Sequence, residues 1–143
     1  MKSTQTLLGY TLIELMVTLA IMGILATLAM DGFQTYTRHK MRLEATNLLR
    51  EISSNETAYR DEFGVYGSLD KLQSAGMAST SQYFSMDVNV NASDAYRRFS
   101  LTLNANKPDD DQQCSNYTLV ADGAVVNTTT TDKDKQDSTA ACL

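Results

Sequence analysis

The sequence predicts an α+β fold in which a long N-terminal helix packs on a four-stranded antiparallel sheet. The first half of this helix is expected to span a membrane and the second half to be amphipathic. Three observations predict this fold: residues 10–30 are almost continuously apolar, the apolar residues that follow recur at helical spacing, and segments of alternating polarity come after residue 83. About 110 residues follow the apolar run, which is enough for one small domain.

The apolar run at residues 10–30 contains a single charge, Glu14. About 20 helical residues are needed to cross ~30 Å of hydrocarbon, so the length of the run predicts a membrane-spanning segment. A carboxylate inside a bilayer costs at least ~2.5 kcal/mol and therefore marks a functional site by default. The alternative is that Glu14, near the start of the run, lies at headgroup depth and costs little.

Nine residues precede the run, MKSTQTLLG, with one lysine and a final glycine. A secretory signal has a basic start, an apolar stretch of ~7–15 residues and then small residues at the cleavage site. Here the apolar run is longer, contains an acid and ends in LATLAM, which is a poor cleavage site. The order of the parts therefore differs from that of a secretory signal.

The stretch GYTLIELMVTLAIMGILA closely resembles the signature of type IV prepilins, in which a short leader ends in Gly, an aromatic residue follows and a Glu lies four residues further on. The resemblance implies a leader peptide at residues 1–9 and cleavage after Gly9 by a prepilin peptidase on the cytoplasmic face. It also implies N-methylation of Tyr10, although the family more often carries Phe at that position.

The resemblance implies a role for Glu14 in subunit assembly. In the family, the α-amine at the new N-terminus of a neighbouring subunit is thought to neutralise this carboxylate as helices pack into a filament. Opposite charges attract more strongly in a low-dielectric bundle than in water. An ion pair within one chain is the alternative, because Tyr10 and Glu14 are spaced i, i+4 on a helix. Pairing between subunits would make Glu14 an assembly register, and pairing within one would make it a bystander.

Beyond residue 30 the pattern predicts that the helix continues as an amphipathic one and ends near residues 61–64. Type IV pilins usually carry a proline about where Asp31 stands, so Asp31 and Gly32, or Gly23, would have to supply any local loosening of the helix. The apolar stripe is expected to form core, and it consists of Phe33, Tyr36, Met41, Ala45, Leu48, Leu49, Ile52 and Tyr59.

The remaining chain predicts one helical turn at residues 68–73 and then strands. Residues 83–90 and 96–105 alternate in polarity, and residues 116–127 form two strands around an Asp122-Gly123 turn, a favoured hairpin signal. Residues 31–143 are thus expected to form one globular domain that includes the second half of the helix. The polar stretch TTTTDKDKQDSTAA is expected to be a loop.

Cys114 and Cys142 are the only cysteines. In an exported domain, two cysteines predict one disulfide, the alternative being two unpaired buried thiols. The bridge resembles the C-terminal disulfide-bounded region of type IV pilins, and it completes the predicted fold.

Catalytic motifs are absent from the sequence, and we expect no enzyme, no cofactor and no metal site. His39, the one histidine, is expected to be an exposed helix residue rather than a general base. The run Asp109-Asp110-Asp111 lacks EF-hand spacing and is expected to be a solvated acidic turn.

Two groups of cations need partners. Arg38, Lys40 and Arg42 follow the apolar run, which by the positive-inside rule alone would place that side in the cytoplasm. The leader and the disulfide indicate the opposite orientation. The three cations are then expected to meet acidic residues of neighbouring subunits, such as Glu44, Glu51 or Glu56.

The second group is Arg97, Arg98 and Lys107. Some small minor pilins that this chain resembles bind DNA during uptake through a basic patch, and the resemblance makes these three residues candidates for such a patch. Without the leader, however, the chain carries 11 basic and 17 acidic residues. Phosphate binding depends on local cations, so solvated strand residues are the favoured interpretation and DNA binding the lesser one.

Taken with the AYRDEFGVYGSLDKL segment, the resemblance implies a small minor pilin that acts in pilus assembly, with DNA uptake, adhesion or twitching motility as further roles. Its implied partners are other pilin subunits, the prepilin peptidase and the inner-membrane assembly platform. The implied location is the inner membrane, with a single span and a periplasmic C-terminal domain, and then the cell-surface pilus. The alternatives are a type II secretion pseudopilin, a DNA-binding competence pilin and an anchored domain that does not assemble.

Overall fold

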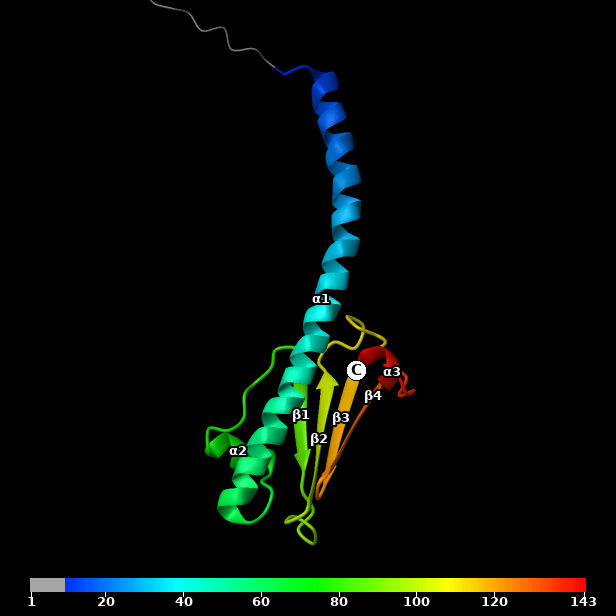
Figure 1. Cartoon of the computed structure of the whole chain (residues 1–143). Coiled ribbons are helices and arrows are strands. Elements are labelled where there is room, and N and C mark those ends of the chain that lie inside the picture. The colour runs from blue at the N-terminus through cyan, green and yellow to red at the C-terminus, as the bar shows by residue number, and fades with distance from the viewer. Residues whose placement is uncertain (1–9) are drawn as a thin grey trace, which may run out of the picture. The chain divides into compact units, whose positions relative to one another are not determined.

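The computed structural model describes residues 10–143, with only the backbone at residues 29 and 31, so the predicted leader lies outside the described residues. The chain divides into two compact units, one up to Tyr36 and one over Thr37–Leu143. The elements in chain order are α1 (Leu12–Phe63), α2 (Leu69–Ser74), β1 (Phe84–Asn89), β2 (Arg98–Ala105), β3 (Asn116–Asp122), β4 (Val125–Thr131) and α3 (Thr139–Cys142) (Figure 1). The predicted α+β fold is confirmed.

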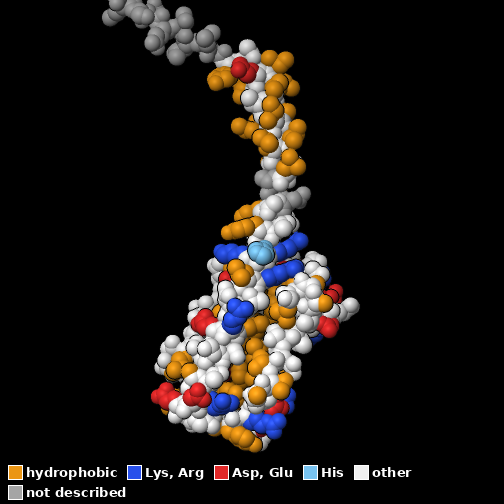
Figure 2. All heavy atoms as spheres, viewed as in Figure 1, with side chains coloured by type: hydrophobic (Ala, Val, Ile, Leu, Met, Phe, Trp, Pro, Cys, Tyr) orange, Lys and Arg blue, Asp and Glu red, His pale blue; other side chains and the backbone are white. Residues whose placement is uncertain are grey.

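The first unit consists of the beginning of α1 and the residues before it. It contributes the part of α1 that is long and apolar enough to cross a membrane, with a mean hydropathy of 2.3 over 18 residues, none of them buried. Hydrophobic side chains cover this part of the helix (Figure 2). Phe33 and Tyr36, which we expected in the core, are 70% and 66% exposed. That prediction is wrong because the sheet begins to cover α1 only at Met41.

The second unit contains a four-stranded antiparallel sheet in the order β1-β2-β3-β4, so each strand pairs with its neighbours in sequence. Its hairpin turn after Asp122 places Gly123 at a φ of +62°, a conformation that glycine adopts without strain. Strand β2 begins at Arg98 rather than residue 96, because the N–H groups of Arg97 and Arg98 both donate to the carbonyl oxygen of Asp94 in a turn.

Strand β4 corrects the predicted polar loop. Its last four residues, 128–131, are threonines that pair with residues 116–119 of β3. Threonine is β-branched and suits a pleated strand, and cross-strand pairing outweighs the polarity of the run. The irregular part of the C-terminal region therefore starts only at Asp132.

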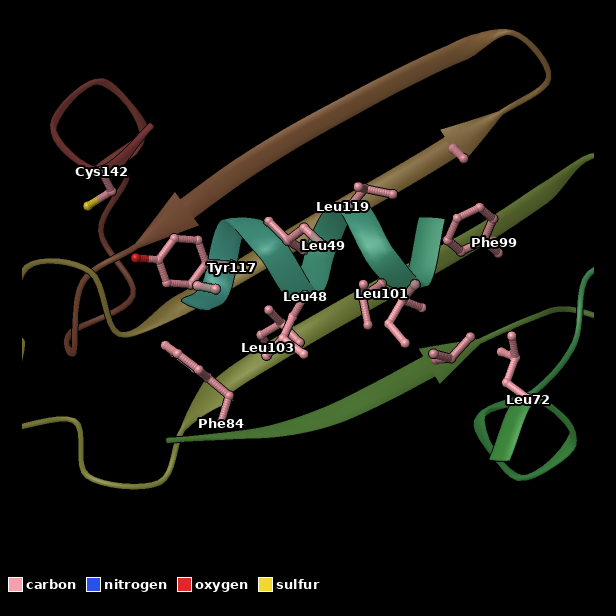
Figure 3. Packing of buried hydrophobic residues seen from close by; sticks show 14 of the residues in the cluster. Leu48, Leu49, Leu72, Phe84, Phe99, Leu101, Leu103, Tyr117, Leu119 and Cys142 are labelled. Atoms are coloured by element: carbon pink, nitrogen blue, oxygen red, sulfur yellow. The ribbon is translucent and has the colours of Figure 1, made fainter. Parts of the chain in front are cut away.

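The core lies between one face of the sheet and the second half of α1 (Figure 3). Leu48 and Leu49 of α1 point toward Leu101 and Leu103 of β2 and Leu119 of β3, and each is at most 5% exposed. Burying a side chain of this size contributes about 1.5–3 kcal/mol relative to leaving it exposed. The opposite face of the sheet carries mostly Ser, Thr, Asn and Asp, as expected of an antiparallel sheet with one face in water.

Helix α1 ends where the sequence predicted, and Gly64 explains why. This glycine has a φ of +79°, and its N–H donates to the carbonyl oxygen of Arg60 at 2.7 Å. A glycine in the left-handed conformation just past the last helical turn is a common helix terminator. The chain then turns back, and Tyr66 packs its ring against Phe99 with 4.7 Å between centroids.

Candidate subunit-assembly site

Glu14 lies in the first turn of α1, and Thr11 caps that turn. The backbone N–H of Glu14 donates to Oγ1 of Thr11 at 3.3 Å, and the N–H of Leu15 donates to the carbonyl oxygen of Thr11 at 3.2 Å. Thr-x-x-Glu at a helix start is the capping-box pattern. Thr11 is not among the site residues predicted from sequence, although the pattern Thr-Leu-Ile-Glu indicates a capping box at this position.

The start of the helix provides a favourable electrostatic environment for the carboxylate of Glu14. A carboxylate in the first turn of a helix interacts favourably with the positive end of the helix dipole. Both Tyr10 and Glu14 are exposed, and Tyr10 lies just before the helix. In the uncut chain the nitrogen of Tyr10 is in a peptide bond, so the chain holds only the carboxylate of the predicted pair. Gly9, the predicted cleavage position, lies outside the described residues.

The polar side chains that follow Glu14 are suited to apolar surroundings. The hydroxyls of Thr18 and Thr27 donate to the carbonyl oxygens of Leu15 and Ile24, three residues earlier, at 2.9 and 2.8 Å. Each hydroxyl proton is thus satisfied within the helix, which a hydrocarbon environment or a helix bundle requires. The other side chains of residues 12–28 are apolar and exposed, apart from Glu14, as in a helix that contacts lipid or other chains.

The predicted disulfide joins Cys114 to Cys142, with 5.8 Å between the Cα atoms. It ties the segment before β3 to α3 at the C-terminus. Beside it, Arg42 makes a two-pronged ion pair with Asp111, from Nε to Oδ2 at 2.6 Å and from Nη2 to Oδ1 at 3.0 Å. Arg42 also donates to the carbonyl oxygen of Ala141 at 3.3 Å. The hydrogen bond to Asp111 raises the pKa of Arg42.

This ion pair corrects two expectations. Asp111 is 3% exposed, so the acidic run at residues 109–111 is solvated only in part. Arg42 is bound within its own chain and is not a free cation for a neighbouring subunit. Lone acidic side chains are rarely buried unless paired, and Arg42 supplies the pair here.

The acidic residues expected to receive those cations are also bound within the chain. Glu44 accepts a hydrogen bond from the hydroxyl of Ser81 at 2.5 Å, and Glu51 accepts one from Ser79. Glu56 is fully buried and accepts the N–H of Gly67 at 2.9 Å. Burial raises the pKa of Glu56 to about 7. Because it is buried, Glu56 cannot contact a neighbouring subunit.

The three cations proposed for DNA do not come together. Arg97 and Arg98 lie at the start of β2, whereas Lys107 follows its end at Ala105. Arg97 is also paired with Asp122, from Nε to Oδ1 at 2.5 Å. His39 is exposed, and within residues 10–143 no group of three or more His, Cys, Asp or Glu is placed to hold a metal ion.

Known proteins share the N-terminal sequence that contains Gly9, Tyr10 and Glu14. Residues 8–30 match the family described as the prokaryotic N-terminal methylation motif. Over 73 residues, 51% of the chain, it is 41% identical to the type IV major pilin protein PilE of Neisseria gonorrhoeae, covering 42% of that protein.

Two further relatives extend this similarity. The chain is 38% identical over 72 residues, 50% of its length, to the fimbrial protein EcpC of Eikenella corrodens, covering 46% of that protein. It is 46% identical over 50 residues, 35% of its length, to a fimbrial protein of Pseudomonas aeruginosa, covering 30% of that protein. The chain thus spans less than half the length of these curated relatives. No solved structure matches the chain.

The resemblance predicted from GYTLIELMVTLAIMGILA is therefore confirmed: the chain carries the prokaryotic N-terminal methylation motif and is similar to type IV pilins and fimbrial proteins over half of its length.

Proposed function

We propose that the chain is a structural subunit of a type IV pilus, in the role of a minor pilin that acts in pilus assembly. The observation that carries the proposal is the methylation motif at residues 8–30, in which Gly9 and Tyr10 come before an exposed apolar helix that carries Glu14 in its first turn. The folded second unit would provide the outer surface of the filament.

In this proposal, removal of the leader after Gly9 creates a cationic amine at Tyr10. Glu14 is four residues further along the same chain, and its exposed carboxylate is accessible to an amine from another chain. Moving the helix from lipid into a filament exchanges one apolar environment for another, so its side chains oppose the transfer little. An unpaired carboxylate in the filament interior is strongly unfavourable. The incoming helix is therefore stable only where an amine meets Glu14, so Glu14 sets the register of the incoming subunit.

The proposal places the chain in the inner membrane before assembly, with a single span and the second unit in the periplasm, and on the cell surface afterwards. Its partners would be other pilin subunits, the prepilin peptidase and the assembly platform. DNA binding is not part of the proposal, because Arg97 and Arg98 lie at the opposite end of β2 from Lys107.

A major-subunit role is the second candidate, and one observation favours it: the similar protein of Neisseria gonorrhoeae is described as a major pilin. The two roles differ in copy number. A type II secretion pseudopilin is a further alternative, against which the Cys114–Cys142 disulfide is the argument.

The test compares the amount of chain in sheared surface filaments with the amount in membranes, for the wild type and for Glu14→Ala. We expect wild-type chain in filaments at low abundance and Glu14→Ala only in membranes. High abundance would favour the major role, and filaments that retain Glu14→Ala would contradict the proposal.

Two control variants separate the roles of Glu14. Glu62→Ala removes an exposed carboxylate near the end of the same helix and should leave assembly unchanged. Thr11→Ala removes the cap but keeps the carboxylate, so it should reduce assembly far less than Glu14→Ala. An equal loss in Thr11→Ala would mean that Glu14 acts only through the start of the helix.

A further inference from the structure

A pocket of about 350 Å³ lies in the second unit, on the face of the sheet opposite the core. Ser100 of β2 pairs with Asn89 of β1 and with Val120 of β3, so these three side chains lie in a row across the sheet. They alternate along the strands with buried core residues such as Phe99 and Leu101, and therefore face away from α1. The polar residues that line the pocket are Asn89, Asn91, Asp94, Arg98, Ser100 and Thr118.

The segment between β1 and β2 contributes Asn91 and Asp94 to this pocket, and hydrogen bonds hold the segment in place (Figure 1). The N–H of Tyr66 donates to the carbonyl oxygen of Ala95 at 2.7 Å. At the other end of the segment, the carbonyl oxygen of Arg97 accepts the N–H of Gly123 at 2.9 Å, and the side chain of Arg97 is paired with Asp122. The segment is thus tied both to the residues after α1 and to the β3–β4 hairpin, so the pocket is preformed in the folded chain.

Two opposite charges line the pocket without pairing with each other. Asp94 is half-buried, its Oδ1 is enclosed by the chain, and no described residue donates a hydrogen bond to its carboxylate. Arg98 is exposed, and within residues 10–143 its guanidinium group makes no ion pair or hydrogen bond. A carboxylate that is partly removed from water without a donor is unfavourable, so an ammonium group placed beside Asp94 would stabilise it.

The balance of charge in the lining indicates the class of ligand. A simple anion would be repelled by Asp94, and a metal cation would be repelled by Arg98. A neutral polyol could use the amide of Asn89 and the hydroxyls of Ser100 and Thr118, but it would give neither charged group a counter-charge. A small zwitterion supplies both counter-charges at once and can also use the neutral polar groups.

We propose that this pocket binds a free α-amino acid, with the ammonium group at Asp94 and the carboxylate at Arg98. The planar guanidinium group suits a carboxylate, to which it can donate two parallel hydrogen bonds. The volume of the pocket is at the lower end of the roughly 300–1,000 Å³ of ligand sites, so we expect an amino acid with a small side chain. This binding goes beyond the proposed function and does not depend on filament assembly.

The test is a titration of the full chain in detergent micelles with glycine, L-alanine or L-serine, followed through the amide NMR signals of residues 89–100. We expect at least one of these amino acids to shift the signals of Asn89, Asp94 and Arg98, with a dissociation constant of about 1 mM or tighter. The same amino acid with its amine acetylated, or with its carboxyl group amidated, should bind about ten-fold more weakly, because each form lacks one of the two charges.

Two variants assign the charges of the ligand to the two side chains. Asp94→Asn should weaken binding of the free amino acid about ten-fold and abolish its advantage over the acetylated form. Arg98→Gln should weaken binding by a similar factor and abolish the advantage over the amidated form. A merely structural role of either residue would instead weaken the binding of all three forms equally.

Asp87→Asn and Arg50→Gln are the matched controls. Asp87 is an exposed carboxylate of β1 two residues from Asn89, Arg50 is an exposed arginine of α1, and neither lines this pocket. Both variants should bind the amino acid as the wild type does. The proposal would be overturned if none of the three amino acids bound, if the blocked forms bound equally well, or if methyl glucoside or calcium bound at these residues instead. Because no filament is involved, failure here leaves the Glu14 test of the proposed function intact.

Discussion

The two units of this chain contain the same kinds of apolar residue but bury them differently. In the unit up to Tyr36, large apolar side chains such as Leu19 and Leu25 are 65% and 60% exposed. In the unit Thr37–Leu143, Leu101 and Leu103 are fully buried between α1 and the sheet. The hydrophobic effect is thus satisfied within the chain in the second unit. The described apolar side chains of the first unit are exposed, and in the proposed function lipid or other chains bury them.

The largest expected change in stability comes from shortening a core side chain in the second unit, and it tests this comparison. Phe99 is 2% exposed and packs against Tyr66, so Phe99→Ala should destabilise the chain by about 4 kcal/mol. Leu19→Ala in the first unit should leave the unfolding midpoint of the second unit unchanged. Chemical denaturation of the full chain in micelles, followed by near-UV circular dichroism, measures both. A similar loss in the two variants would break the comparison.

The disulfide gives the next effect. Cys114 and Cys142 are 28 residues apart in sequence, and a closed loop of that length stabilises a fold by about 3.5 kcal/mol on the chain-entropy model. The double variant Cys114→Ser/Cys142→Ser should lose about that much in the same denaturation measurement. Adding reductant to the wild type should reproduce the loss. A midpoint that does not change with reductant would show that the pairing of β4 with β3 already holds the C-terminal region in place.

The ion pair between Arg42 and Asp111 follows. Arg42→Met leaves the carboxylate of Asp111 buried without a partner and should cost roughly 3 kcal/mol. The double variant Arg42→Met/Asp111→Asn removes that charge and should recover most of the loss. Lys133→Met is the control, since its side chain lies 3.9 Å from Asp109, which is 86% exposed. If the double variant were no better than Arg42→Met, the cost would be one of packing rather than charge.

The smallest effect is a pH dependence from Glu56. Its pKa is raised from 4.5 to about 7, so between these values the folded chain keeps a proton that the unfolded chain has released. The full difference corresponds to about 3 kcal/mol, so stability should fall by at most that amount as pH rises from about 4.5 to 7 and then level off. Glu56→Gln should remove the fall, because it keeps an acceptor for the N–H of Gly67.

The control for that prediction is Glu62→Gln, which replaces an exposed carboxylate of the same helix and should keep the wild-type pH dependence. The free energy of unfolding of all three chains, measured across the pH range, decides the matter. A fall that persists unchanged in Glu56→Gln would assign the pH dependence to another group.

Periodicity predicted the elements that local sequence controls. The end of α1, the strands that became β1 to β3 and the turn at Gly123 all follow from residue spacing and turn chemistry. The strand character of the four threonines in β4 was missed, because it comes from pairing with β3 rather than from an apolar pattern. The burial of Asp111 and Glu56 was missed for the same reason, since their partners Arg42 and Gly67 are 69 and 11 residues away.

The assembly site shows the same division. Gly9, Tyr10 and Glu14 could be proposed from sequence because they lie in one local motif, which the family match at residues 8–30 covers. The partner of Arg42 could not be found from sequence, because Asp111 is 69 residues away and meets it only in the folded chain. A local motif is therefore enough to predict a cleavage position, whereas the partner of a charged side chain such as Arg42 is seen only in the folded chain.

The central claim is that the first unit becomes an assembly helix once its leader is removed. Intact-mass measurement and N-terminal sequencing of the chain recovered from sheared surface filaments test it most directly. We predict a mature chain that begins at N-methylated Tyr10. An uncut chain, or one cut near Ala29 and absent from filaments, would contradict the claim and return Glu14 to an ordinary residue at the start of a helix.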